Sequence, residues 1–114
     1  MPFKAREHDD AVVFGITGKF LGSIDGPSFR DSLQGFKEAG VKKVVIDLSG
    51  ADMMDSSGIG AMIAGLTSMR NAGGDMCLAA LKKRIRNVFL MTRLLGSVFE
   101  DYETVDEALA SFNA

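Results

Sequence analysis

Two adjacent serines follow an aspartate in the stretch MDSSGIGAMIAGL, and no other part of this 114-residue chain is as suited to chemistry. Asp55, Ser56 and Ser57 are residue types that begin helices by accepting hydrogen bonds from free backbone N–H groups. A serine hydroxyl at a helix start can also carry a phosphate, because the free N–H groups and the positive end of the helix dipole favour the added charge. The stretch therefore predicts either a simple helix cap or a phosphorylation site.

The helix expected after these serines has an apolar face and a face without charge. The apolar stripe has helical spacing and consists of Ile59, Met62, Ile63, Leu66 and Met69. The other face consists of Gly60, Ala61, Ala64, Gly65, Thr67 and Ser68. Each glycine costs about 1 kcal/mol of helix propensity, so a close approach of another backbone should offset that cost. Either the fold covers this face or a partner docks on it, and we favour a partner, whose binding a nearby phosphate would oppose.

Catalytic and cofactor functions receive less support. Serine hydrolysis needs a base and an orienting acid, but the stretch is not G-x-S-x-G, and the one histidine, His8, is expected in a solvated turn. A Ser–Lys arrangement with Lys82 or Lys83 stays open. The P-loop pattern is absent, which leaves at most weak nucleotide binding at the helix start. We expect no enzymatic activity, no cofactor and no metal site, since ligand-spaced His, Cys and acidic residues are absent.

Composition indicates one soluble domain over residues 1–114. The net charge of -2 argues against nucleic acid, and we interpret the basic run LKKRIR as the solvated face of a helix. The lone Cys77 cannot form an internal disulfide and suits a reducing compartment. No signal peptide or membrane-length apolar stretch is visible, so we expect a cytoplasmic protein without membrane insertion.

Hydrophobic periodicity and turn residues predict which elements position the serines. Strands are expected over 2–7, 11–18, 42–48 and 75–81, a short edge segment over 97–102, and helices over 27–40, 57–71, 82–96 and 105–112. The stretches 19–26 and 49–55 are expected to be loops. This order predicts an α/β fold with a mixed sheet of four to five strands, an N-terminal hairpin and about four helices. The serines then follow the carboxyl end of a strand, where function is common in such sheets.

The stretch VVIDLSGADMMDSSGIGAMIAGL resembles the core of STAS domains, specifically the bacterial anti-sigma factor antagonists. The strand, the D-L-S-G turn, the D-S-S-G-[IL]-G motif and the following helix match in order. The turn N-A-G-G-D-M and the ending VFEDYETVDEALASF match as well, so the resemblance covers essentially the whole chain. It implies a single STAS domain that regulates transcription by partner switching.

In this family the phosphorylated serine directly follows the motif aspartate, so the resemblance points to Ser56, with Ser57 as the alternative. The implied partner is an anti-sigma factor serine kinase with a histidine-kinase-like ATPase fold. The unphosphorylated antagonist binds that kinase and frees the sigma factor, phosphorylation ends the binding, and a serine phosphatase reverses it.

We expect the partner to contact the serine motif, the small-residue face and the loop before the first helix. These residues are Asp25, Asp55, Ser57, Gly58, Gly60, Ala61, Ala64 and Gly65. The segment GKFLGSIDGPSF departs from the family pattern G-x-[IL]-D, since it is a few residues longer. The alternative function is therefore a STAS regulatory or scaffold subunit of another signalling assembly.

Overall fold

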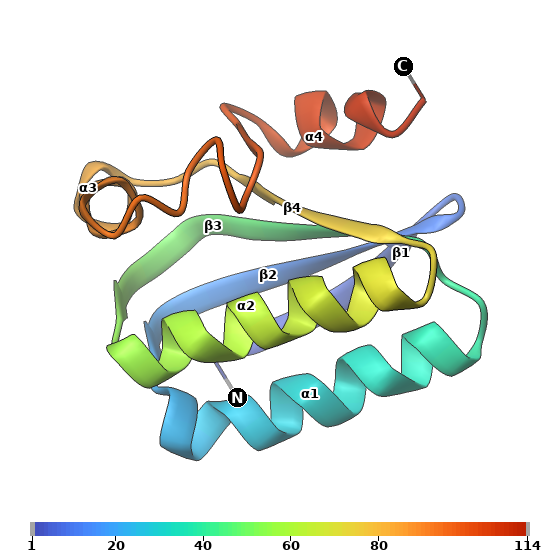
Figure 1. Cartoon of the computed structure of the whole chain (residues 1–114), viewed down its shortest axis with the longest axis horizontal. Helices are drawn as coiled ribbons and strands as arrows, with labels where there is room; N and C mark the ends of the chain where they lie inside the picture. Colours follow the sequence, from blue (N-terminus) through green and yellow to red (C-terminus); the bar gives the residue numbers. More distant parts are fainter. Residues whose placement is uncertain (1, 114) are drawn as a thin grey trace.

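The computed structural model describes residues 2–113, and in this part of the chain a five-stranded sheet carries four helices (Figure 1). Met1 and Ala114, the ends of the expected 1–114 domain, lie outside the described residues. The strands are β1 (Phe3–His8), β2 (Ala11–Phe20), β3 (Lys43–Met54), β4 (Asp75–Ala79) and β5 (Asp101–Tyr102). The helices are α1 (Gly22–Glu38), α2 (Ser56–Asn71), α3 (Lys83–Met91) and α4 (Val105–Ser111).

The strands lie in chain order across the sheet. β1 pairs antiparallel with β2 as a hairpin, and each later strand pairs parallel with the one before it. This arrangement confirms the predicted mixed sheet. The parallel pairs need crossover connections, which α1, α2 and α3 supply. Among the described helices, none is both long enough and apolar enough to cross a membrane.

Helices cover both faces of the sheet (Figure 1). The main core lies on the face covered by α1 and α2. There the rings of Phe14 of β2 and Phe29 of α1 pack edge to face, with their centroids 5.2 Å apart. A smaller core lies under α4, where Ala108 packs among Val13, Val45 and Cys77. Because β3 and β4 are covered on both sides, their paired segments are almost continuously apolar.

The prediction of a loop over 49–55 is wrong for most of its length, because β3 continues to Met54. β4 pairs with β3 only from Lys43 to Asp47, but β2 remains beside β3 until Phe20 faces Met54. The extension contains Ser49, Gly50 and Asp52, which are polar or small because this part of the sheet is only two strands wide. Pairing with β2, which sequence patterning does not reveal, keeps it extended.

The prediction that Pro27 opens the first helix is also wrong, because α1 begins at Gly22 and contains Pro27. Two side chains hold the additional turn. Asp25 Oδ2 accepts the backbone N–H of Leu21 at 2.8 Å, and Asp55 Oδ1 accepts that of Gly22 at 3.0 Å. Helix α3 is also shorter than predicted, since it ends at Met91, five residues before the predicted end at residue 96. A turn follows it, in which Arg93 has a φ of 59°.

Candidate functional site

The starts of α1 and α2 meet at one carboxylate. Asp55 is the N-cap of α2, and its Oδ1 accepts the N–H of Gly58 at 2.7 Å. The same oxygen accepts the N–H of Gly22 at 3.0 Å and the hydroxyl of Ser57 at 3.2 Å. These hydrogen bonds, with that from Gly22 the largest cause, lower the pKa of Asp55. A charged Asp55 therefore ties its own helix start to that of α1 through Gly22, 33 residues earlier in the chain.

Two glycines allow this close approach. A Cβ on Gly22 would lie 2.1 Å from the carbonyl carbon of Ser57 and 2.4 Å from the nitrogen of Gly58. A Cβ on Gly58 would lie 2.7 Å from the carbonyl oxygen of Phe20. These contacts are with backbone atoms, which cannot rotate away. Sequence reasoning missed Gly22, and its signal was a glycine inside a segment interpreted as a loop.

The two serines differ in their contacts although both are exposed. Ser57 donates its hydroxyl to Asp55 and lines a groove beside α1. Ser56 is the first residue of α2, and within residues 2–113 its hydroxyl makes no hydrogen bond to another residue. The hydroxyl of Ser56 is therefore exposed and without a hydrogen-bond partner among residues 2–113, at the positive end of the α2 dipole.

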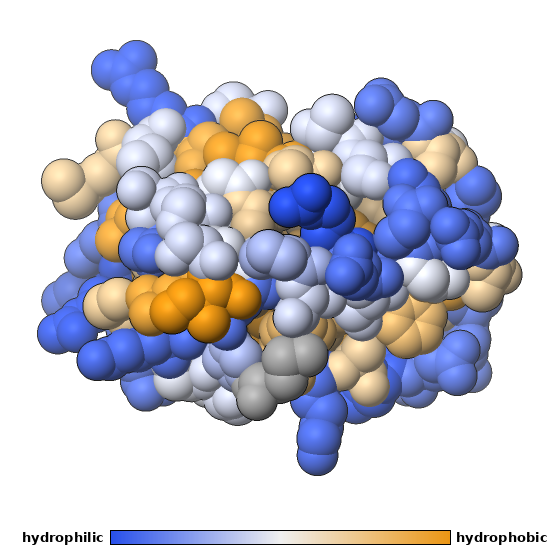
Figure 2. All heavy atoms as spheres, turned by 90° about the horizontal axis from the view of Figure 1, so that it is seen from below, coloured by the Kyte–Doolittle hydropathy of each residue, from blue (hydrophilic) through white to orange (hydrophobic). Residues whose placement is uncertain are grey.

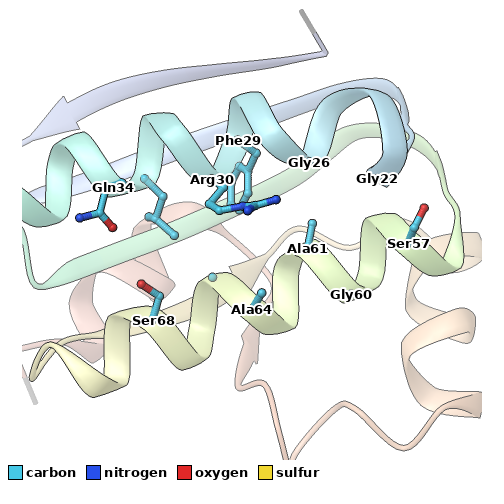
Figure 3. Close-up of a pocket in the computed structure, with 12 residues that line it drawn as sticks. Gly22, Gly26, Phe29, Arg30, Gln34, Ser57, Gly60, Ala61, Ala64 and Ser68 are labelled. Atoms are coloured by element: carbon cyan, nitrogen blue, oxygen red, sulfur yellow. The ribbon is translucent and has the colours of Figure 1, made fainter.

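A groove of about 440 Å³ runs between α1 and α2 (Figure 3). Its apolar lining includes Phe29 and Leu33 of α1. Ser57 lies at the end where α2 begins, Ser68 lies towards the other end, and Arg30 extends between the two helices (Figure 3). Sequence reasoning did not select Arg30. This residue reaches the groove only because α1 and α2 pack side by side, which the sequence does not show.

The predicted small-residue face of α2 is divided by the fold. Gly60, Ala61 and Ala64 border the groove, and a Cβ on Gly60 would meet nothing within 4 Å. Gly65 also lines the groove but is buried, and a Cβ there would lie 3.1 Å from the side chain of Leu33. The fold therefore covers part of this face through α1, and the rest of the face stays open to solvent.

Asp25 and Gly58 lie at the helix starts but not in the groove lining. Asp25 is half-buried and binds the backbone of Leu21, so its carboxylate holds its own helix. Gly58 is buried between the ends of β2 and β3. In the structure both residues serve the local fold.

The bases considered for serine chemistry make other contacts. Lys82 Nζ lies 3.1 Å from Asp52 Oδ1. His8 is the last residue of β1 rather than a turn residue, and its Nε2 lies 3.6 Å from Asp9 Oδ2. The recorded partner of Ser57 is Asp55. The arrangement is that of a capped helix start beside a groove.

The surface near the helix starts also exposes an apolar side chain that sequence reasoning missed. Ile24, in the first turn of α1, is 69% exposed. Figure 2 shows the molecule from below, and hydrophobic atoms appear at several places on this face, including its left side, where both helices begin in Figure 1. Sequence reasoning did not identify Ile24 as an exposed helix residue, because it lies in the stretch 19–26 that was expected to be a loop.

Comparison with known proteins finds relatives of this chain. A relative from Thermotoga neapolitana, named as a candidate anti-sigma factor antagonist, is 30% identical over 74 residues, 65% of each chain. BtrV of Bordetella bronchiseptica, named in the same way, is 24% identical over 90% of this chain and 88% of its own.

Solved structures of similar proteins share the fold. A candidate anti-sigma factor antagonist from Thermotoga maritima has a TM-score of 0.88 at 21% identity, over 98% of this chain and 95% of its own. Unphosphorylated SpoIIAA, an anti-sigma factor antagonist, has a TM-score of 0.75 at 17% identity, over 97% and 96%. Phosphorylated SpoIIAA, a Bacillus cell fate determinant, has a TM-score of 0.75 at 20% identity, over 96% and 98%. The family model described as the STAS domain matches residues 2–108. The chain therefore belongs to the STAS domain family.

Proposed function

We propose that this protein is a phosphorylation-controlled anti-sigma factor antagonist of the cytoplasm, a binding switch rather than an enzyme. Its partner is an anti-sigma factor serine kinase with a histidine-kinase-like ATPase fold, which the unphosphorylated form binds. Phosphorylation of Ser56 releases the kinase, and a serine phosphatase restores binding. The exposed hydroxyl of Ser56 at the start of α2, beside the groove, is the observation that carries the proposal.

The contacts of the two serines favour Ser56 as the acceptor. A phosphate on Ser57 would replace its hydrogen bond to Asp55 with repulsion between two anions. A phosphate on Ser56 leaves the three hydrogen bonds of Asp55 in place. Modification of Ser56 therefore changes the surface while the helix start keeps its cap.

The proposed contact surface consists of the groove rim and the helix starts. Gly60, Ala61 and Ala64 give a smooth apolar wall without a long side chain, which a partner can approach closely. Asp25, Asp55, Ser57, Gly58 and Gly65 shape the surface from beneath or at its edge. About two negative charges on Ser56 would lie at the end of this apolar contact and disfavour it.

The test is to capture the kinase from the native host, purify it, and measure its binding to three variants by calorimetry. Ser56→Asp should keep the wild-type circular dichroism spectrum and bind at least about 100-fold more weakly, because a charge then faces an apolar contact. Ser56→Ala should bind like the wild type and should stay bound when ATP is added. Ser57→Ala should still accept phosphate from the kinase.

Phosphopeptide mapping completes this experiment. Phosphate found on Ser57 in the wild type, or undiminished kinase binding by Ser56→Asp, would contradict the proposal. Capture of a transporter or scaffold protein instead of an ATPase would favour the alternative, a STAS regulatory subunit of another assembly.

A further inference from the structure

Residues 76–99 have a charge balance opposite to that of the rest of the chain. They hold five of the thirteen Lys and Arg residues and none of the fifteen Asp and Glu residues, which leaves eight basic against fifteen acidic elsewhere. The five are Lys82, Lys83, Arg84, Arg86 and Arg93. The proposed switch uses none of them, so this local concentration of positive charge needs a separate explanation.

Helix α3 and the residues that flank it present these cations together with apolar side chains. Ile85 and Phe89 are buried and hold the helix against the fold, whereas Leu90 is 50% exposed and Met91 is 83% exposed. With Ile24 they are the large hydrophobic residues exposed within residues 2–113. Positions seven apart share one side of a helix, so Leu90 follows Lys83 and Met91 follows Arg84 on the outward side.

We define the α3 surface as Lys83, Arg84, Leu90, Met91 and Arg93. All five side chains are exposed, and α3 lies at one end of the molecule (Figure 1). Within residues 2–113, no carboxylate lies within 4.0 Å of the three cations of this surface. The two neighbouring cations differ, since Lys82 pairs with Asp52 and Arg86 with Asp101. The α3 surface therefore combines uncompensated positive charge with protruding apolar groups.

We propose that the α3 surface binds the headgroups of an anionic lipid bilayer, peripherally and reversibly. Cations at headgroup level and apolar side chains that enter the boundary beneath it are what such a surface favours. A lipid boundary accommodates protruding side chains without a preformed pocket. Nucleic acid is a poorer fit, because bases stack on exposed aromatic rings, and the two aromatic residues of this segment, Phe89 and Phe99, are fully buried.

The proposal predicts weak binding that depends on salt and on lipid charge. Three cations and two apolar side chains give less attraction than the clusters of four to eight basic residues typical of strong lipid recognition. Salt at about 0.5 M shortens the screening length well below the value of about 10 Å at 0.1 M. The bound fraction should therefore fall at least about tenfold between low and high salt.

The test is flotation of the purified full chain with two kinds of vesicles. One kind is phosphatidylcholine alone, and the other contains about 30% phosphatidylglycerol. The wild type should float with the anionic vesicles and not with the neutral ones. The triple variant Lys83→Gln, Arg84→Gln, Arg93→Gln and the single variant Met91→Ser should each lose at least about five-sixths of the bound fraction, with unchanged circular dichroism spectra.

Matched variants separate the surface from net charge and general hydrophobicity. The control for charge is Lys4→Gln, Arg6→Gln, Lys19→Gln, which removes three exposed cations from β1 and β2. The control for hydrophobicity is Ile24→Ser, since Ile24 is 69% exposed at another place. Both controls should float like the wild type. Equal flotation with neutral vesicles, no flotation at low salt, or equal loss in the controls would each overturn the proposal.

Discussion

A single oxygen of Asp55 accepts hydrogen bonds from the starts of two helices. The cap on α2 could be predicted, because Asp is a preferred N-cap and Gly58 follows three residues later. The bond to Gly22 could not, because it joins residues 33 apart and depends on the pairing of β2 with β3. At the scale of the residue, sequence therefore reveals local capping and misses contacts between distant elements.

The charge of Asp55 should make stability depend on pH. The folded pKa is lowered, so the contribution of the carboxylate is present above the unfolded pKa of about 3.9 and is lost as the pH falls through the folded value. Asp55→Asn keeps an oxygen acceptor but not the charge. The variant should have a lower urea midpoint than the wild type at pH of about 7, and the difference should shrink towards pH of about 3.

Urea titrations at both pH values measure this difference. Asp31→Asn is the control, because Asp31 is an exposed residue of α1 and none of the hydrogen bonds recorded within residues 2–113 involves its side chain. A pH-independent gap between Asp55→Asn and the wild type would contradict the assigned role of the charge.

At the scale of the element, the start of α1 is decided by contact and not by propensity. Pro27 suggests a helix beginning near residue 27, since proline favours the first turn. The structure places the beginning at Gly22, because Asp25 and Asp55 bind the first backbone N–H groups. Helix α2 was predicted to within one residue, since its serines, its apolar stripe and its glycine turn are all local signals.

Two glycines of neighbouring helices should respond oppositely to alanine. Gly22→Ala would place a methyl group 2.1 Å from the backbone of Ser57, so the helix starts must separate, and the free energy of unfolding should fall by about 3 kcal/mol. Gly60→Ala meets nothing within 4 Å and should raise it by about 0.5–1 kcal/mol through helix propensity. Thermal or urea unfolding of both variants measures the pair. Equal stability of Gly22→Ala and the wild type would show that the two helix starts are less tightly apposed in solution.

At the scale of the molecule, the alternation of strands and helices could be predicted with the correct topology class. The central strands could be predicted because burial on both faces of the sheet makes their paired segments almost continuously apolar. The extension of β3 could not be predicted in this way, because the polar or small residues Ser49, Gly50 and Asp52 interrupt its apolar pattern on a two-stranded part of the sheet. Likewise, the sequence predicted a small-residue face on α2 without showing that α1 lies opposite part of it.

Hydrogen exchange should reproduce the hierarchy of the sheet. Val44, Val45 and Ile46 of β3 are fully buried and paired on both sides, so their amides should exchange only through global unfolding. β5 pairs only through Asp101 and Tyr102, and its amides should exchange at least about 100-fold faster through local opening. Amide exchange followed by NMR measures both. Equal protection of β5 and β3 would indicate that the last strand belongs to the same cooperative unit.

The register pair of Phe20 with Met54 has a consequence for how such a protein can change over generations. Helix α1 starts at Gly22 and helix α2 at Ser56, each two residues after a member of that pair. The paired ends of β2 and β3 therefore fix where the two helices begin relative to each other. Residues added to only one of the two strands would shift one helix along the other. The carboxylate of Asp55 would then lose its hydrogen bond with Gly22 of α1. Insertions should therefore be tolerated in β2 and β3 only when both strands lengthen together.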